Sequence, residues 1–404
     1  MTRFVPTSID ELREAIGAAL AAEEPVELVA GGTKRGLGRP LQTPHVVDLT
    51  RLSGIRDYAP NELVLTAGAA TPLTAIDRAL NAAGQMLAFE PPDWRALLGQ
   101  AHGSPTLGGI LACNLSGPRR IRSGAARDHF LGFSGVSGRA EVFKAGGRVV
   151  KNVTGYDLPK LMAGSYGTLA ALAEVTVKVL PRPETAATVL VCGIAPDAAV
   201  PLMSAALGSP HEVSGAAYLP PGTPRPPPLP ASGVVALRVE GPAPSVAYRR
   251  DALLAEFAAS GETAALGEAD SGAVWRDIGN VAPLAGLADR AVWRLSVAPG
   301  RGAAVAQTIT RQVDATWFLD WGGGLVWLAV LVPGDAGASV IRGALDGAVG
   351  NGGHATLVRG SPGLRAAVPV FEPQPGPLAA LSRRVKEGFD PRHILNPGRM
   401  VEGI

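Results

Sequence analysis

Hydrophobic and polar positions near the start of the chain follow first a helical and then a strand spacing. Ile9, Leu12 and Ile16 fall on one helical face, and Ser8 with Glu11 matches a capping box, so we expect a helix from residue 9. Short apolar runs over 25–30 and 45–49 read as strands. These elements predict a small α+β unit over residues 1–55.

A second α+β unit is expected over residues 56–183. Alternating apolar and polar residues near its end indicate an antiparallel strand with one wet face, and Pro181 and Pro183 follow it. The expected elements are a strand over 63–68, a helix with Pro72 at its first position closed by Gly84, hairpin strands over 139–143 and 148–150 around Gly146-Gly147, and a strand over 173–179.

Residues 184–385 predict a separate α+β domain. Its pattern gives two β-α-β passes, which we interpret as one ferredoxin-like sandwich. The expected elements are strands over 234–239, 292–297 and 354–358, helices over 245–257, 302–312 and 338–349, and a hairpin over 317–330 around Gly322-Gly323-Gly324.

Composition narrows the class of protein. The formal charge of +2 on 404 residues gives no argument for binding nucleic acid. Cys113 and Cys192 are the only cysteines, too few to hold an iron–sulfur cluster or a structural zinc ion, and they suggest a reduced, cytoplasmic setting. We expect no secretion signal and no transmembrane span, because no apolar run reaches the roughly 18 residues that one needs.

Two glycine-bearing segments carry the candidate chemistry. The strand over 25–30 ends in a glycine turn with Thr33, Lys34 and Arg35 beside it, and such a turn can bind an anion through its backbone N–H groups. Our hypothesis is that it holds the pyrophosphate of a flavin dinucleotide. Thr106 can cap a helix whose first turn contains Gly108 and Gly109, which would be a second phosphate-facing element. A plain helix start packed on a sheet explains that second segment equally well.

The ordered set of motifs resembles a known family. Ala30-Gly31-Gly32-Thr33, then Thr106-Leu107-Gly108-Gly109 with Asn114, then Arg127-Asp128, resemble the PCMH-type FAD-binding domain of the vanillyl-alcohol-oxidase family. The motifs at 151–158, 164–169 and 389–400 resemble its glycolate oxidase and D-lactate dehydrogenase branch. Within that branch, the short second half and the 320–324 segment are similar to the FAD-binding subunits of glycolate oxidase complexes.

This resemblance implies a fold, a cofactor and partners. The fold would be an FAD-binding domain over 1–183, a ferredoxin-like cap over 184–385, and a C-terminal segment over 386–404 that returns to the first domain. FAD would be bound non-covalently. The partners would be a catalytic flavoprotein subunit and an iron–sulfur subunit, with a small 2-hydroxyacid as substrate and membrane association only through partner subunits. The implied FAD-binding residues are Ala30, Gly31, Gly32, Thr33, Lys34, Gly36, Thr106, Leu107, Gly108, Gly109, Asn114, Arg127, Asp128, Gly164, Gly167, Thr168, Val175 and Asn396.

The catalytic residues are less defined by the sequence. Arg359 and Arg294 of the cap could bind a carboxylate, and His393 is a candidate base. Catalytic members of the family that this chain resembles carry closely spaced histidines that hold a metal beside the 2-hydroxyacid carboxylate. The six histidines here are far apart, so we expect no bound metal, and this departure argues against independent 2-hydroxyacid oxidation. Four interpretations therefore stay open: an oxidoreductase subunit, a flavin-carrying relay or assembly subunit, a stand-alone oxidase of alcohols or sugars, and a structural partner without flavin.

Overall fold

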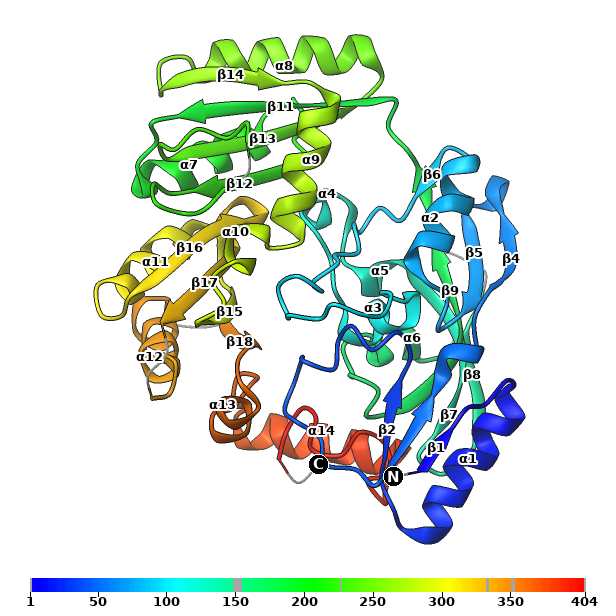
Figure 1. Cartoon of the computed structure of the whole chain (residues 1–404). Helices are drawn as coiled ribbons and strands as arrows, with labels where there is room; N and C mark the ends of the chain where they lie inside the picture. Colours follow the sequence, from blue (N-terminus) through cyan, green and yellow to red (C-terminus); the bar gives the residue numbers. More distant parts are fainter. Residues whose placement is uncertain (1, 148–154, 226, 332–333, 350–352, 403–404) are drawn as a thin grey trace.

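The computed structural model describes residues 2–147, 155–225, 227–331, 334–349 and 353–402. The first part of the chain and the strands from β11 onward form two lobes, and helix α14 lies below them (Figure 1). The second hairpin strand expected over 148–150 and the first half of the 151–158 motif lie outside the described residues.

The first unit is built as the sequence predicts. Strands β1, β3 and β2 form a parallel sheet in that order. Ser8 caps the helix, and its hydroxyl accepts a hydrogen bond from the Glu11 N–H at 3.2 Å. The elements are β1 (Thr2–Phe4), α1 (Ile9–Ala22), β2 (Val26–Val29), β3 (His45–Asp48) and the 3-10 turn η1 (Leu49–Arg51).

The second unit contains a five-stranded antiparallel sheet in the order β4-β5-β9-β7-β8. A short β10–β6 ladder lies beside it. Its elements are β4 (Ile55–Ala59), η2 (Pro60–Glu62), β5 (Val64–Gly68), α2 (Leu73–Ala82), β6 (Gln85–Met86), α3 (Leu107–Cys113), α4 (Arg120–Ser123), α5 (Ala126–His129), β7 (Phe130–Ser137), β8 (Val142–Gly146), α6 (Leu158–Met162), β9 (Ala170–Lys178) and β10 (Leu180–Pro181).

Two expectations within this unit are wrong. Pro72 is the N-cap of α2 rather than its first residue. The hairpin turns at Gly138-Arg139-Ala140, not at Gly146-Gly147, because β7 and β8 are the paired strands and Gly146 lies opposite Gly132. Gly138 is required at this turn, since a Cβ there would lie 2.2 Å from Asp390 Oδ1.

The second lobe is one eight-stranded antiparallel sheet, in the order β14-β11-β13-β12-β16-β17-β15-β18. Each half runs β-α-β-β-α-β along the chain, with its first and third strands adjacent, which is the ferredoxin-like arrangement. The halves meet where β12 pairs with β16, with Tyr218 opposite Leu319. The elements are β11 (Thr185–Cys192), α7 (Pro196–Gly208), β12 (Gly215–Leu219), β13 (Val234–Gly241), α8 (Ala243–Phe257), β14 (Glu262–Leu266), α9 (Glu268–Gly279), α10 (Ala282–Ala285), β15 (Arg290–Ser296), η3 (Pro299–Arg301), α11 (Gly302–Thr310), β16 (Ala315–Asp320), η4 (Trp321–Gly323), β17 (Leu325–Leu331), α12 (Ala338–Val349) and β18 (His354–Arg359).

The cap therefore holds two ferredoxin-like units rather than the one expected. The expected elements form the whole second unit but only β13 and α8 of the first. The duplication was hidden because β11 and β12 are buried along almost their whole length, so they show no alternation of apolar and polar residues.

The C-terminal segment returns to the first unit after α13 (Pro362–Ala367) and α14 (Gly376–Phe389). Leu395 forms a parallel bridge with Val26 at the free edge of β2. Lys386 holds the returning chain, because its Nζ donates to the carbonyl oxygens of Thr168 and Leu395 at 2.7 and 3.1 Å. None of the helices in the described ranges has the length and apolar character needed to cross a membrane.

A four-residue ion network joins the two lobes. Glu90 and Arg119 come from the first lobe, and Arg238 and Glu240 lie on β13 of the second. Arg238 donates to both oxygens of Glu90 at 2.7 and 3.1 Å, and Arg119 donates to Glu240 at 2.7 and 3.0 Å. These ion pairs fix how the cap sits on the first lobe.

Candidate functional site

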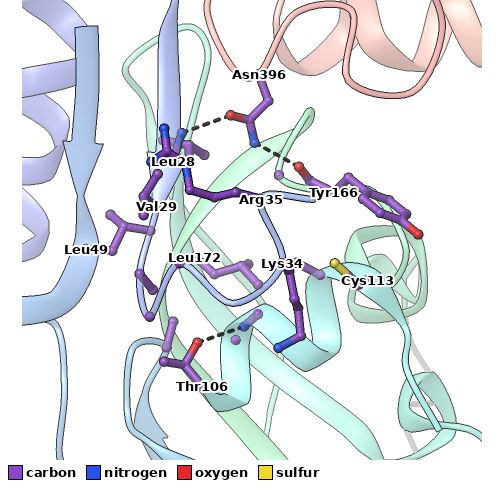
Figure 2. Close-up of a pocket in the computed structure, with 18 of the residues that line it drawn as sticks. Leu28, Val29, Lys34, Arg35, Leu49, Thr106, Cys113, Tyr166, Leu172 and Asn396 are labelled. Atoms are coloured by element: carbon purple, nitrogen blue, oxygen red, sulfur yellow. Dashed lines mark hydrogen bonds between the residues drawn. The ribbon is translucent and has the colours of Figure 1, made fainter. Parts of the chain in front are cut away.

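A cavity of about 120 Å³ opens between β2, helix α3, the loop at 166–167 and the returning C-terminal segment. Figure 2 shows the side chains of Lys34, Thr106, Cys113, Tyr166 and Asn396 around it. Both glycine-bearing segments line this one cavity, the first with Gly31 and Gly32 and the second with Gly108 and Gly109.

Close backbone contacts explain the glycines. A Cβ on Gly31 would lie 1.8 Å from the Ser104 carbonyl oxygen, and a Cβ on Gly108 would lie 2.7 Å from that of Ala69. Gly32 has a φ of +74° and nothing within 4 Å of its Cβ position. The first two glycines therefore allow chain segments to touch, whereas Gly32 shapes an open turn.

The start of α3 does not offer free N–H groups to the cavity, contrary to the expectation of exposed donors. The Leu107 and Gly108 amides donate to the carbonyl oxygens of Thr71 and Ala69, at 3.0 and 2.8 Å. The Gly109 amide donates to the Thr106 hydroxyl at 3.3 Å, as Figure 2 shows. The close packing of the helix start on the sheet is thus the better description of this segment.

Free donors come instead from the turn after β2. Among the described residues, the amides of Gly32, Thr33 and Lys34 have no protein acceptor. The Lys34 side chain extends from this turn toward α3 and Thr106 (Figure 2). Its Nζ lies 3.3 Å from the Thr33 hydroxyl, and no carboxylate in the described part of the chain pairs with it. Burial lowers the pKa of Lys34. Turn and lysine together present the kind of donors that an anion site needs.

The other end of the cavity is closed by Asn396. Its side chain accepts a hydrogen bond from the Leu28 N–H at 2.9 Å and donates to the Tyr166 carbonyl oxygen at 2.8 Å (Figure 2). Burial raises the pKa of the Cys113 thiol to about 11, and burial also raises the pKa of Tyr166. Both groups are therefore neutral near pH 7 and act as poor bases.

The structure places the expected FAD-binding residues in two groups. Those that line the cavity are Ala30, Gly31, Gly32, Thr33, Lys34, Thr106, Gly108, Gly109, Gly167 and Asn396. Those outside its lining are Gly36, Leu107, Asn114, Arg127, Asp128, Gly164, Thr168 and Val175.

Several residues of the second group have structural contacts. Leu107 and Val175 are fully buried in the hydrophobic core. Asn114 ends α3 in a left-handed conformation, and its side chain accepts a hydrogen bond from the Arg127 N–H at 3.1 Å. Asp128 accepts one from the Ala125 N–H at 2.9 Å. These contacts hold α3 and α5 behind the cavity.

The three catalytic candidates lie outside the cavity lining. The Arg359 guanidinium donates its hydrogen bonds to main-chain oxygens, including those of Leu97 at 3.2 Å and Ala285 at 3.0 Å. Arg294 lies over the Trp321 ring, with its Cζ 5.1 Å from the ring centroid. His393 has a φ of +52°, and its buried Nδ1 has no hydrogen-bond partner.

Sequence reasoning missed part of the lining. Its additional members include Leu28, Arg35, Leu49, Cys113, Tyr166, Leu172 and Arg399. Arg399 packs against the turn, because its guanidinium donates to the carbonyl oxygens of Arg35 and Leu37, both at 3.1 Å. Arg399 lies in the 389–400 motif, three residues after Asn396, and this position could have marked it as a residue of the cavity lining.

Comparisons with known proteins agree with this geometry. A family model described as "FAD binding domain" matches residues 3–146. The chain is 33% identical over 390 residues to the glycolate oxidase subunit GlcE of Escherichia coli (strain K12), covering 96% of each protein. It is also 37% identical over 102 residues to the glycolate oxidase subunit GlcD of Bacillus subtilis, covering 25% of this chain and 21% of that protein.

Solved structures share the fold. The 4-ethylphenol oxidase from Gulosibacter chungangensis superposes with a TM-score of 0.70 at 13% identity, over 99% of this chain and 89% of that one. P-cresol methylhydroxylase gives a TM-score of 0.69 at 13% identity, over 99% and 88% of the two chains. At such identities the likeness establishes the architecture alone.

Proposed function

We propose a function for this chain from the premise that it belongs to the glycolate oxidase subunit family of FAD-linked oxidoreductases. It is an oxidoreductase subunit whose cofactor is FAD. Our proposal is that it is the FAD-binding subunit of a complex that oxidises glycolate or a related 2-hydroxyacid. The supporting observation is that one cavity unites the glycine turn, the unpaired Lys34 and the start of α3.

The residues around the cavity fit a flavin dinucleotide. We propose that the free amides after β2 and the Lys34 side chain hold its diphosphate, because among the described residues these amides have no protein acceptor and Lys34 has no carboxylate partner. Gly32, whose Cβ position is open, would let the turn approach the cofactor, and Gly31 and Gly108 keep the neighbouring chain segments packed around it. Asn396 would close the other end of the cavity. Bound FAD would supply the hydride-accepting chemistry, while the protein positions it and excludes water. Covalent attachment is not expected at Cys113, because its raised pKa disfavours the reactive thiolate.

The domain division belongs to the same proposal. Residues 1–183 would bind FAD, residues 184–385 would cap it, and residues 386–404 would complete the cavity. Cys113 and Cys192 are free thiols and too few for a cluster, so electrons would leave the flavin for an iron–sulfur partner subunit. A catalytic flavoprotein subunit would complete the complex in the cytoplasm, and any membrane association would come through these partners.

One alternative has an observation in its favour. A 2-hydroxyacid must lose its hydroxyl proton to a base during oxidation. The titratable groups lining the cavity include Cys113 and Tyr166, whose raised pKa values keep both protonated near neutral pH, so neither is a ready base. This favours a relay or assembly subunit that carries FAD while a partner oxidises the substrate.

Anaerobic mixing with glycolate separates the two versions. An oxidoreductase subunit would lose its flavin absorption near 450 nm within seconds, whereas a relay subunit would stay yellow until its partner is added. Dithionite reduction provides the control that the flavin can be reduced. A preparation that carries no flavin after gentle purification would contradict both versions, and rapid turnover of other alcohols or sugars with oxygen would instead identify a stand-alone oxidase.

A further inference from the structure

Two arginines from different lobes border the same tryptophan. The Arg120 Cζ lies 4.2 Å from the centroid of the Trp321 ring, and the Arg294 Cζ lies 5.1 Å from it. Arg120 belongs to α4 of the first lobe, whereas Arg294 lies on β15 of the cap. We call these three residues the double-arginine site.

Trp321 is fixed from both lobes. Its indole N–H donates to the Gly117 carbonyl oxygen of the first lobe at 3.1 Å. Its own backbone N–H donates to the Asp320 carboxylate at 2.7 Å, and the ring is almost completely buried. The indole is therefore a rigid platform on which both guanidinium groups rest.

Neither guanidinium has a carboxylate partner among the described residues. The groups whose negative charge would raise the two pKa values most are Asp128 for Arg120 and Tyr166, ahead of Asp320, for Arg294, and no ion pair joins either arginine to them in the described part of the chain. Burial lowers the pKa of both arginines, and the positive charge of Arg120 adds to this effect at Arg294. Arg294 is half-buried without a counterion, which is unfavourable and points to a missing anion; the exposed Arg120 borders the same ring as a second cation.

The double-arginine site also adjoins the cofactor cavity. Burial raises the pKa of Tyr166, and the cations Arg294 and Arg399 oppose that rise, so Arg294 lies within electrostatic reach of the phenol. Tyr166 itself lines the cavity. An anion held by the two arginines would thus lie beside this end of the cavity, between the cap and the first lobe.

We propose that Arg120 and Arg294 bind one carboxylate-bearing ligand without a metal ion and thereby draw the cap onto the FAD-binding lobe. Guanidinium groups recognise carboxylates through paired N–H donors, and the Trp321 ring keeps both groups in position. The assignment of this site to the substrate carboxylate rests on the proposed function. Binding of an anion at the site can be measured separately, without any turnover of substrate.

Oxalate is the probe of choice, because it has two carboxylates and no oxidisable C–H bond. Calorimetric titration of the FAD-loaded protein with oxalate, in chelator-treated buffer, should give saturable binding. Arg120→Gln and Arg294→Gln should each raise the dissociation constant at least about tenfold, the loss expected for a charge-assisted hydrogen bond. Arg294→Lys keeps the charge but loses the paired donors, so it should fall between wild type and Arg294→Gln.

Arg122→Gln is the matched control. Arg122 lies on the same helix, but its exposed guanidinium already pairs with Glu212 at 2.6 Å. This variant should bind oxalate within about twofold of wild type. Flavin content and thermal midpoint check that each variant is folded, and Arg120→Gln and Arg294→Lys keep the test informative if Arg294→Gln fails to fold.

Absence of saturable oxalate binding to the wild-type holoprotein, or wild-type affinity in both glutamine variants, would overturn the double-arginine site. Different outcomes would contradict the proposed function. If glycolate bleaches the flavin while the variants bind oxalate normally, the site is wrong and oxidation by this subunit stands. If oxalate binds as expected but glycolate never reduces the flavin, the site stands and the relay version applies.

Discussion

At the scale of single residues, Lys34 stands out because no carboxylate in the described part of the chain balances its side chain. A part-buried ammonium without a carboxylate partner is costly, and here it lies beside a turn with free amides. The cost is offset if a diphosphate binds there. Lys34 thus connects the sequence motif to the affinity for FAD.

Replacing Lys34 with methionine tests this role. The apolar chain keeps the volume and removes the charge, so the affinity for FAD should fall by about 10- to 100-fold, the loss of one charge-assisted contact. Quenching of flavin fluorescence on titration measures it. Arg39→Met is the control, because Arg39 pairs with the exposed Glu402 at 3.2 Å instead of lining the cavity. Wild-type affinity in Lys34→Met would show that this cation does not contact the cofactor.

At the scale of elements, the glycine turn after β2 contains positions with opposite tolerance. A Cβ at Gly31 meets the Ser104 carbonyl oxygen at 1.8 Å, whereas a Cβ at Gly36 has its nearest neighbour, a Leu98 methyl group, at 3.8 Å. Gly31→Ala must push β2 away from the 103–104 loop, while Gly36→Ala needs no movement.

We therefore expect Gly31→Ala to lose most FAD binding and to lower the free energy of unfolding by about 1–3 kcal/mol. Gly36→Ala should keep the affinity for FAD within about threefold and the stability within about 0.5 kcal/mol. Urea unfolding and flavin titration measure both quantities. Equal behaviour of the two variants would mean that the β2 turn does not contact the 103–104 loop as described.

The elements also show what the sequence could and could not predict. Ser8, Thr106 and the Gly322-Gly323 turn carry local signals of caps and tight turns, and the structure confirms these elements. The first half of the cap lacked such signals. Its helix α7 contains Pro201 and is apolar on most sides, so no clear helical period emerges from its sequence.

The candidate site was predictable to a similar degree. Glycines mark places where chain segments approach closely. The order of the motifs predicted that both glycine segments share one site, and both line the same cavity. The inward hydrogen bonds of α3 were not predictable, because they depend on the neighbours Thr71 and Ala69. The arginines on Trp321 come from distant segments, and only the folded chain brings Arg120 beside the indole.

At the scale of the whole molecule, the ion network of Glu90, Arg119, Arg238 and Glu240 decides how firmly the lobes are joined. Opposing the effect of burial, the two arginines hold the pKa of Glu90 below its ordinary value and lower that of Glu240 to about 2. A carboxyl with a lowered folded-state pKa stabilises the fold above its unfolded pKa near 4.5 and loses that contribution as the pH falls through the folded value.

Glu90→Ala should therefore lower the free energy of unfolding by about 3–5 kcal/mol at pH 7, because two part-buried arginines lose a shared partner. Calorimetric unfolding of wild type and variant between pH 2 and 7 measures this difference. It should shrink on acidification, since wild-type Glu90 also becomes neutral. A difference that stays constant over this range would contradict the electrostatic origin of the contact. Glu402→Ala, at an exposed pair, is the control.

Asn396 spans β2 and the Tyr166 loop, and it lies 368 positions after Leu28. A ribosome delivers the chain from its N-terminus, so the glycine turn emerges long before the residue that finishes the cavity around it. Under the proposed function, stable loading of flavin would accordingly wait until the chain through residue 396 has been made.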